Sequence, residues 1–155
     1  MSLISQMMKP WYADPGYFLQ GITPRPLEAS DASIATTSNT DVLVIAPYDG
    51  SVLEAIFSST TVLAANDTNF VTFSITNLGQ AGAGSAAMLA ATAVNTTQLT
   101  GGTGLVAGGF RTLLLTTTTA NLEIKKNDVI RVRFAVTGTL GGAIADPVVQ
   151  LRLAP

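Results

Sequence analysis

The side chains best suited to acid–base and nucleophilic chemistry are scarce in this chain. Its 155 residues include no histidine and no cysteine, so the commonest general base, the commonest metal ligand and the thiol nucleophile are all missing. A serine–lysine pair would be the remaining route to an activated nucleophile. However, Lys9, Lys125 and Lys126 lie in an arm or in a turn. We therefore predict that the protein is not an enzyme.

The carboxylates are better explained by backbone turns than by a reactive site. A facing pair of carboxylates could hydrolyse a glycosidic bond, and the loop that holds Asn66 and Asn69 could offer oxygens to Ca²⁺. Calcium usually takes about six to eight oxygen ligands, and this loop has too few acids. The glycines form no phosphate-binding pattern, so we predict no metal and no cofactor. Five aspartates lie at strand starts or turns, where Asp commonly turns the backbone: Asp41, Asp49, Asp67, Asp128 and Asp146.

Charge and hydropathy narrow the class of partner. The net charge is −2 and the eight basic residues are scattered, whereas phosphate binding needs clustered Lys and Arg, so we predict no nucleic-acid partner. No apolar run reaches the roughly 18 residues of a membrane helix, and we predict no membrane association. Only 12% of the residues are charged and 47% are hydrophobic, against about 25% charged in ordinary soluble domains. Much of the surface is therefore expected to meet other protein.

Residues 1–32 differ from the rest and are predicted to form an extended N-terminal arm. Four of the seven prolines and the only tryptophan fall within this segment. An extended, proline-broken segment cannot bury several rings against itself, although each burial would contribute roughly 1.5–3 kcal/mol. The arm therefore needs another surface. The side chains predicted to make a protein interface are Trp11, Tyr12, Tyr17, Phe18, Met7 and Met8.

Three surfaces could receive the aromatic side chains of the arm. A neighbouring protein is favoured, because aromatic residues are common anchors of interfaces and methionine adapts to irregular apolar surfaces. The rings could also fold back on their own domain, or they could form a platform for stacking sugars. The sequence leaves these three alternatives open.

Residues 33–155 are predicted to form a single all-β domain. Short segments rich in Thr, Val and Ile alternate with turn signals at intervals of roughly 8–12 residues, which is typical of an antiparallel β-sandwich or a jelly-roll-like barrel. Segment 85–94 has a composition between strand and helix, and its neighbours favour a strand. The expected strands are 41–46, 51–58, 70–77, 85–94, 111–119, 128–137 and 147–153.

Alternation of apolar and polar residues predicts which side chains face the core. Segment 41–46 is instead a continuous apolar run and is expected to be buried. In segment 51–58, Leu53 should face the same side as Ala55 and Phe57. The clearest alternating sets are Val71, Phe73 and Ile75; Ile130, Val132, Phe134 and Val136; and Val149, Leu151 and Leu153.

Several turn signatures resemble those of the decoration proteins of tailed phages, which are also called cement or head-stabilising proteins. The signatures are APYDGSV at 46–52, ANDTNF at 65–70, ITNLG at 75–79, TANL at 119–122 and KNDV at 126–129. The resemblance covers about residues 42–153; segment 82–109 matches it poorly, and the arm lies outside it. It implies a β-rich homotrimer on the outer capsid surface that clamps adjacent subunits of the major capsid protein and catalyses no reaction.

The sequence thus predicts a structural virion protein that decorates and stabilises a phage capsid. The alternative is a carbohydrate-binding or adhesive module of a phage head fibre or tail, in which Trp11 and the neighbouring tyrosines would stack on sugars.

Overall fold

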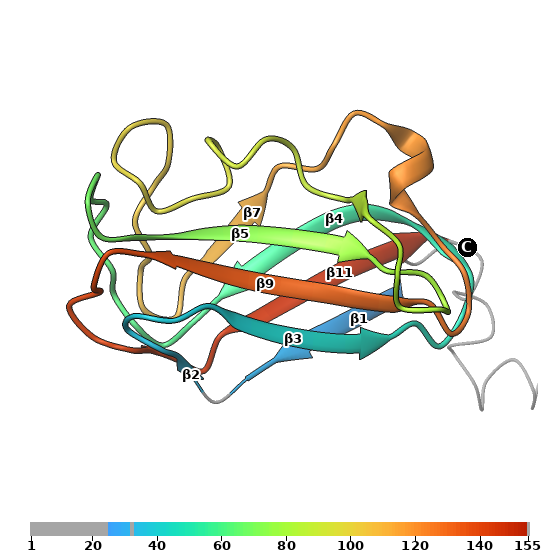
Figure 1. The fold of residues 1–155 in the computed structure, drawn as a ribbon, viewed down its shortest axis with the longest axis horizontal. Coiled ribbons are helices and arrows are strands. Elements are labelled where there is room, and N and C mark those ends of the chain that lie inside the picture. The colour runs from blue at the N-terminus through green and yellow to red at the C-terminus, as the bar shows by residue number, and fades with distance from the viewer. Residues whose placement is uncertain (1–24, 32, 155) are drawn as a thin grey trace, which may run out of the picture.

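The computed structural model describes residues 25–31 and 33–154, and these form an antiparallel β-sandwich (Figure 1). The predicted all-β class is confirmed. No helix in this part of the chain is long and apolar enough to cross a bilayer. The elements are β1 (Arg25–Ser30), β2 (Ser33–Ile34), β3 (Thr40–Ile45), β4 (Gly50–Ser58), β5 (Phe70–Asn77), β6 (Ala86–Ala87), β7 (Phe110–Leu113), the 3₁₀ helix η1 (Thr119–Leu122), β8 (Glu123–Ile124), β9 (Val129–Thr137), β10 (Ile144–Ala145) and β11 (Val148–Ala154).

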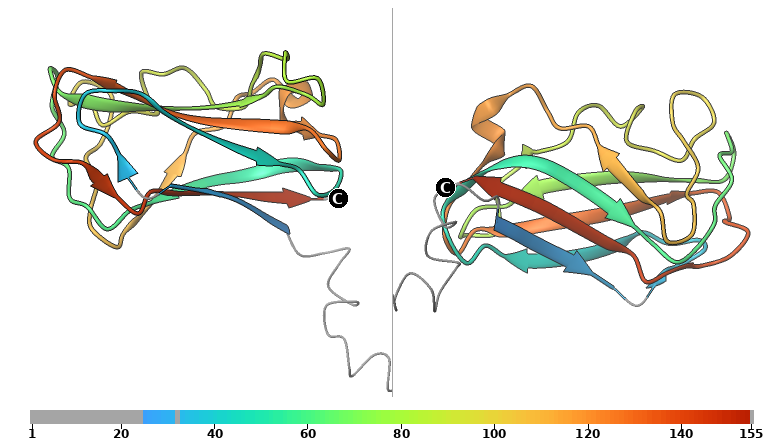
Figure 2. Two further views of the ribbon diagram at one scale, coloured as in Figure 1. Left: turned by 60° about the horizontal axis from the view of Figure 1, so that its bottom comes forward. Right: turned by 180° about the vertical axis from the view of Figure 1, so that it is seen from behind.

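Two antiparallel sheets pack face to face, as the tilted view in Figure 2 shows. One sheet has the strand order β1-β11-β4-β7, with β8 also paired to β4, and the other has the order β3-β9-β5-β6. Strands β10 and β2 form a separate short pair. Strands β1 and β7 therefore lie at opposite edges of the same sheet, with β11 and β4 between them.

The core lies between the two sheets and is centred on three phenylalanines. Phe57 of β4 faces Phe73 of β5 with ring centroids 4.8 Å apart, and the Phe134 ring of β9 lies 5.9 Å and 6.0 Å from these two rings. The tilted and edge-on arrangements suit the charge distribution of aromatic rings. The alternation predicted for β5, β9 and β11 is confirmed, except that Val136 is only partly buried.

The sheet begins earlier in the chain than the predicted domain boundary at residue 33. Strand β1 pairs with β11 from Arg25, opposite Leu153, to Ser30, opposite Val148. The Leu27 and Ala29 side chains of β1 are buried, so this part of the predicted arm contributes to the core. Residues 1–24 lie outside the described residues.

The prediction of which β4 side chains face the core is wrong for the first half of the strand. Val52 is 2% exposed and Leu53 is 55% exposed, although Ala55 and Phe57 are buried as predicted. The register explains this, because β11 pairs Arg152 with Glu54 but the next residue, Leu153, with Val52. A β-bulge at this point adds one residue to β4 and reverses the side on which the preceding side chains lie.

Strand β3 is an edge strand rather than the buried strand expected for 41–46. It pairs with β9 alone, and its side chains alternate, so that Leu43 and Ile45 lie on the outer face of the sandwich. Only Val42 and Val44 pack against the core, and both are partly buried. Continuous hydrophobicity therefore did not distinguish a strand with two buried faces from an edge strand with an apolar outer face.

Segments 85–94 and 111–119 contain less strand than predicted. In the first, only β6 forms a ladder, and one isolated bridge joins Leu89 to Leu115. In the second, β7 is four residues long and starts at Phe110. Segment 95–109, which lies between them, is a loop whose start is fixed to β5: the Val71 amide donates to Thr97 Oγ1 at 2.9 Å.

Candidate interaction surface

Apolar side chains gather along β7, at one edge of its sheet. Phe110 and Thr112 lie on the outer face, and Leu114 continues the same alternation just beyond the strand, because side chains two residues apart point the same way. Phe110 is 78% exposed and Leu114 is 57% exposed. Phe110 and Thr112 have uncharged neighbours on β4, with Ser58 opposite Phe110 and Ile56 opposite Thr112. This edge of the sandwich therefore offers apolar surface to a partner.

Two hollows flank the outer face of β7. The first has a volume of about 380 Å³ and lies between β7 and the loops that contain Val94 and Val106. The second, of about 340 Å³, is lined by Leu53, Glu54 and residues 112–115. Thr112 lines both hollows, so they adjoin each other. We call this surface the β7 trough and define it by five exposed apolar side chains: Leu53, Val94, Val106, Phe110 and Leu114.

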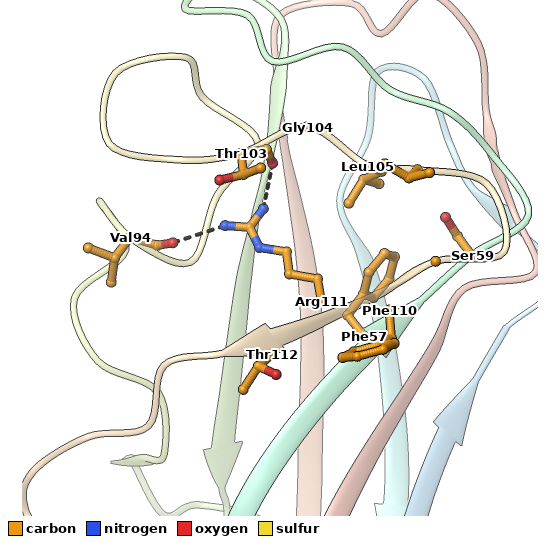
Figure 3. Close-up of a pocket in the computed structure, with 11 residues that line it drawn as sticks. Phe57, Ser59, Val94, Thr103, Gly104, Leu105, Phe110, Arg111 and Thr112 are labelled. Carbon is orange, nitrogen blue, oxygen red and sulfur yellow. Dashed lines mark hydrogen bonds between the residues drawn. The ribbon is translucent and has the colours of Figure 1, made fainter.

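Arg111 holds the wall of the first hollow in place, as Figure 3 shows. Its guanidinium donates to the Thr103 carbonyl oxygen at 2.7 Å and to the Val94 carbonyl oxygen at 3.0 Å. The guanidinium carbon lies 5.5 Å from the centre of the Phe73 ring, within range of a cation–π interaction. Burial lowers the pKa of Arg111. The ion pairs found among the described residues involve Arg133 and Arg152, so Arg111 has no carboxylate partner there.

A close contact between two loops shapes the rim of the first hollow. Leu63 and Leu105 exchange both backbone hydrogen bonds, at 3.1 Å and 2.7 Å. A Cβ atom added at Gly104 would lie 2.5 Å from the Leu63 carbonyl oxygen, which explains glycine at this position. Because the two segments are antiparallel, Val62 comes next to Val106, and both side chains are exposed.

Asn95 fixes the other end of the trough. Its side chain is buried, accepts a hydrogen bond from the Leu114 amide at 2.8 Å and donates one to the Leu114 carbonyl oxygen at 2.9 Å. The Asn95 side chain thus makes the two hydrogen bonds to the Leu114 backbone that a neighbouring strand would otherwise make. This pairing holds the Leu114 backbone extended and keeps its side chain on the outer face.

A second exposed apolar surface lies on β3, in the other sheet. Leu43 and Ile45 face outward there. An ion pair borders them: Arg133 Nε and Nη2 each donate to a carboxylate oxygen of Asp41 at 2.6 Å. The hydrogen bond and the nearby charge of Arg133 lower the pKa of the Asp41 carboxyl below its ordinary value of 3.8.

The polar side chains of the loop at 66–69 bind backbone amides of their own turn and of a neighbouring loop. Asn66 Oδ1 accepts hydrogen bonds from the Thr68 and Asn69 amides at 2.7 Å and 2.8 Å, and Asp67 Oδ1 accepts one from the Thr100 amide at 2.8 Å. Among the described residues, no three acidic side chains are grouped as a metal site would need. The oxygens considered for calcium are thus engaged in shaping loops.

The six predicted interface residues, Trp11, Tyr12, Tyr17, Phe18, Met7 and Met8, all lie outside the described residues. The residues of the β7 trough were not predicted from the sequence. A usable signal existed, because Phe110, Thr112 and Leu114 alternate with Arg111 and Leu113. The alternation alone does not show which of the two sets faces the core. Arg111 does not show it either, because its guanidinium binds carbonyl groups at the sheet edge.

Comparison with known proteins yields only distant structural likenesses. The sequence matches no protein-family model, and no curated protein matches it. The fold is similar to a chain of the cyanophage Pam1 capsid asymmetric unit, with a TM-score of 0.38 and 19% identity over 87% of this chain and 89% of that chain. It is also similar to chains of the infectious bursal disease virus Gx and Gt strains, with TM-scores of 0.34, identities of 14% and 13%, and coverage of 84% of this chain and 32% of each of those chains.

Proposed function

We propose that this chain is a structural virion protein that decorates and stabilises the outer surface of a phage capsid, joining adjacent major capsid subunits as a homotrimer. The observation that carries the proposal is the β7 trough, a hollowed surface on the outside of the sandwich with five exposed apolar side chains. Exposed apolar patches of this kind, when contiguous, are typical of protein–protein contact.

The composition of the chain supports a role in assembly. A chain with 12% charged residues can bury a large share of its surface without desolvating many ions, which is costly when a charge is left unpaired. The turn signatures that resemble decoration proteins supply the finer part of the proposal: the position outside the capsid, the trimer and the coat subunits as partner.

Heating of capsids tests the proposed function. Capsids that lack the protein are mixed with the purified full-length chain, and release of DNA is followed with a dye as temperature rises. We expect the added protein to raise the release temperature, and light scattering of the free protein to give three times the monomer mass. Equal heat resistance with and without the protein would reject the decoration role.

The same preparations test the carbohydrate-binding alternative. A monomeric protein that binds a glycan array, and that loses this binding on Trp11→Ala, would support an adhesive module in place of a decoration protein.

A further inference from the structure

We propose that the β7 trough binds the aromatic segment of the N-terminal arm, residues 11–18, from a second copy of this chain. The inference rests on the self-association proposed above and names the two surfaces that make it. One surface is the trough; the other is the segment with Trp11, Tyr12, Tyr17 and Phe18.

The hollows of the trough match aromatic side chains in size. Their volumes are about 380 Å³ and 340 Å³, whereas a cavity of about 150 Å³ lined by apolar side chains is enough to bind benzene. Each hollow can therefore hold a ring together with part of its neighbour. The arm offers two aromatic pairs, Trp11 with Tyr12 and Tyr17 with Phe18, and the trough offers two hollows.

The spacing of the pairs fits the spacing of the hollows. Phe110 beside the first hollow and Leu114 in the second are separated by four residues of nearly extended chain, which is about 13 Å. Tyr12 and Tyr17 are five residues apart and can span up to about 17 Å. Pro15 lies between them and restricts the preceding residue to extended conformations. An extended arm can thus place one pair in each hollow.

Charge also favours this segment. Arg111 lines the first hollow, and it has no carboxylate partner among the described residues. Asp14 is the only acidic residue before Arg25, and it lies between the two aromatic pairs. A segment seated with a pair in each hollow would bring Asp14 between the two hollows. The Arg111 guanidinium lies beside the first hollow, and the Glu54 carboxylate beside the second hollow is already paired with Arg152.

The position of β1 favours an arm from a neighbouring copy. Residues 1–24 join the sheet at Arg25, on the edge opposite β7. Two strands lie between these edges, so the arm would have to cross about 14 Å of sheet. That crossing would pass over the Arg152–Glu54 ion pair, which lies on the outer face of β11 and β4 and borders the second hollow. The arm of a neighbour can approach β7 from outside the sheet without this crossing.

Trp11 allows a direct test because it is the only tryptophan. Its emission in the full-length protein is measured together with the light-scattering mass over a range of concentrations. We expect the emission to shift to shorter wavelength as the mass rises. Both changes should have their midpoint at the same protein concentration. The double substitution Phe110→Ser with Leu114→Ser should raise that midpoint about tenfold or more, equivalent to about 1.4 kcal/mol or more. Asp14→Asn should raise the midpoint less than the double substitution does, and it changes no residue of the β domain.

The matched control is Leu43→Ser with Ile45→Ser on β3. Leu43 is 61% exposed, close to the exposure of Leu114, but it belongs to the other sheet, so this control should leave the midpoint unchanged. Circular dichroism confirms that each variant is folded.

Three outcomes would overturn the inference. A Trp11 emission that depends on the trough but not on concentration would show the arm bound to its own domain. Unchanged self-association in the trough variant would show that another surface joins the copies, and a monomer at every concentration would exclude both the docking and the trimer. The capsid-heating experiment is separate: loss of heat protection with intact docking would reject the decoration role alone.

Discussion

Asn77 Nδ2 donates a 2.8 Å hydrogen bond to Asp128 Oδ2, and both side chains are buried. This bond joins the end of β5 to the turn before β9. The same carboxylate oxygen accepts the Lys125 amide at 2.9 Å, and Asn77 Oδ1 accepts the Gly79 amide at 2.7 Å. Two turns therefore depend on one pair of buried polar groups.

Replacement of Asp128 by alanine should destabilise the domain. The substitution leaves the Asn77 amide and the Lys125 backbone amide without their shared acceptor, and a buried donor without a partner costs about 1–3 kcal/mol. In a domain of this size we expect a fall in Tm of about 2–4 °C for each kcal/mol, measured by calorimetry. Glu28→Ala on the exposed face of β1 is the control and should change stability by less than about 0.5 kcal/mol. Equal effects would show that the Asn77–Asp128 contact contributes little.

Replacement of Gly138 by alanine should also destabilise the domain. Gly138 has φ +70°, and a Cβ atom there would overlap the Thr68 carbonyl oxygen and Asn69 Oδ1. Left-handed backbone strain alone costs of order 1 kcal/mol for a residue with a side chain, and the overlap adds to it. Urea unfolding should therefore show a lower midpoint for Gly138→Ala. Gly141→Ala, where the added atom has no neighbour within 4 Å, should leave the midpoint near that of the unchanged protein.

Replacement of Arg111 by lysine should loosen the wall of the first hollow. Lysine cannot donate to the Thr103 and Val94 carbonyl groups with the fixed fork of a guanidinium, and we expect a loss of about 1–3 kcal/mol in the free energy of unfolding. Faster hydrogen exchange should be confined to residues 94–106. Arg152→Lys, which changes an exposed ion pair with Glu54, is the comparison and should cost less than about 1 kcal/mol. Exchange that rises equally across all strands would argue against a local role of Arg111.

The ion pair of Asp41 with Arg133 should make part of the stability depend on pH. Because the folded pKa of Asp41 is lowered below 3.8, the folded protein binds this proton less readily than the unfolded chain. The contribution is fully present above the unfolded pKa and is lost as pH falls through the lowered folded value. Asp41→Asn should therefore cost up to about 1 kcal/mol at neutral pH, a modest value for an exposed pair.

Below both pKa values, Asp41→Asn and the unchanged protein should unfold at nearly the same urea concentration. High salt should reduce the difference at neutral pH. A difference that grows as pH falls would have the opposite sign and would contradict the assignment.

The strands with strict alternation could be predicted from sequence because their environment is simple. In the middle of β5 and β9, apolar side chains that face the core alternate with side chains that face outward and are mostly polar, so a period of two indicates the buried face. Strand β4 differs because its bulge depends on pairing with β11, a contact distant in sequence that no local pattern encodes. Leu53 consequently lies on the outer face, where it lines the β7 trough.

The candidate surface was harder to predict than the core. Leu43 and Phe110 are as apolar as core residues, and only the strand order shows that they lie at sheet edges with outward side chains. Asn95 and Arg111 shape the trough through bonds to backbone carbonyl groups, which have no signature in residue type. The sequence could indicate an assembly role through its low charge, but it could not locate the β7 trough.

The attachment of the arm through β1 also has a mechanical consequence. Residues 1–24 lead directly into β1, which is joined to β11 by six consecutive residue pairs. Hydrogen bonds between antiparallel strands lie across the strand direction, so tension along β1 is shared by the whole ladder and the bonds are loaded in shear. Tension perpendicular to β1 would open them one at a time. A neighbour that pulls the arm along β1 would therefore meet a strong anchor, and the direction of the load would decide how much force the joint between copies survives.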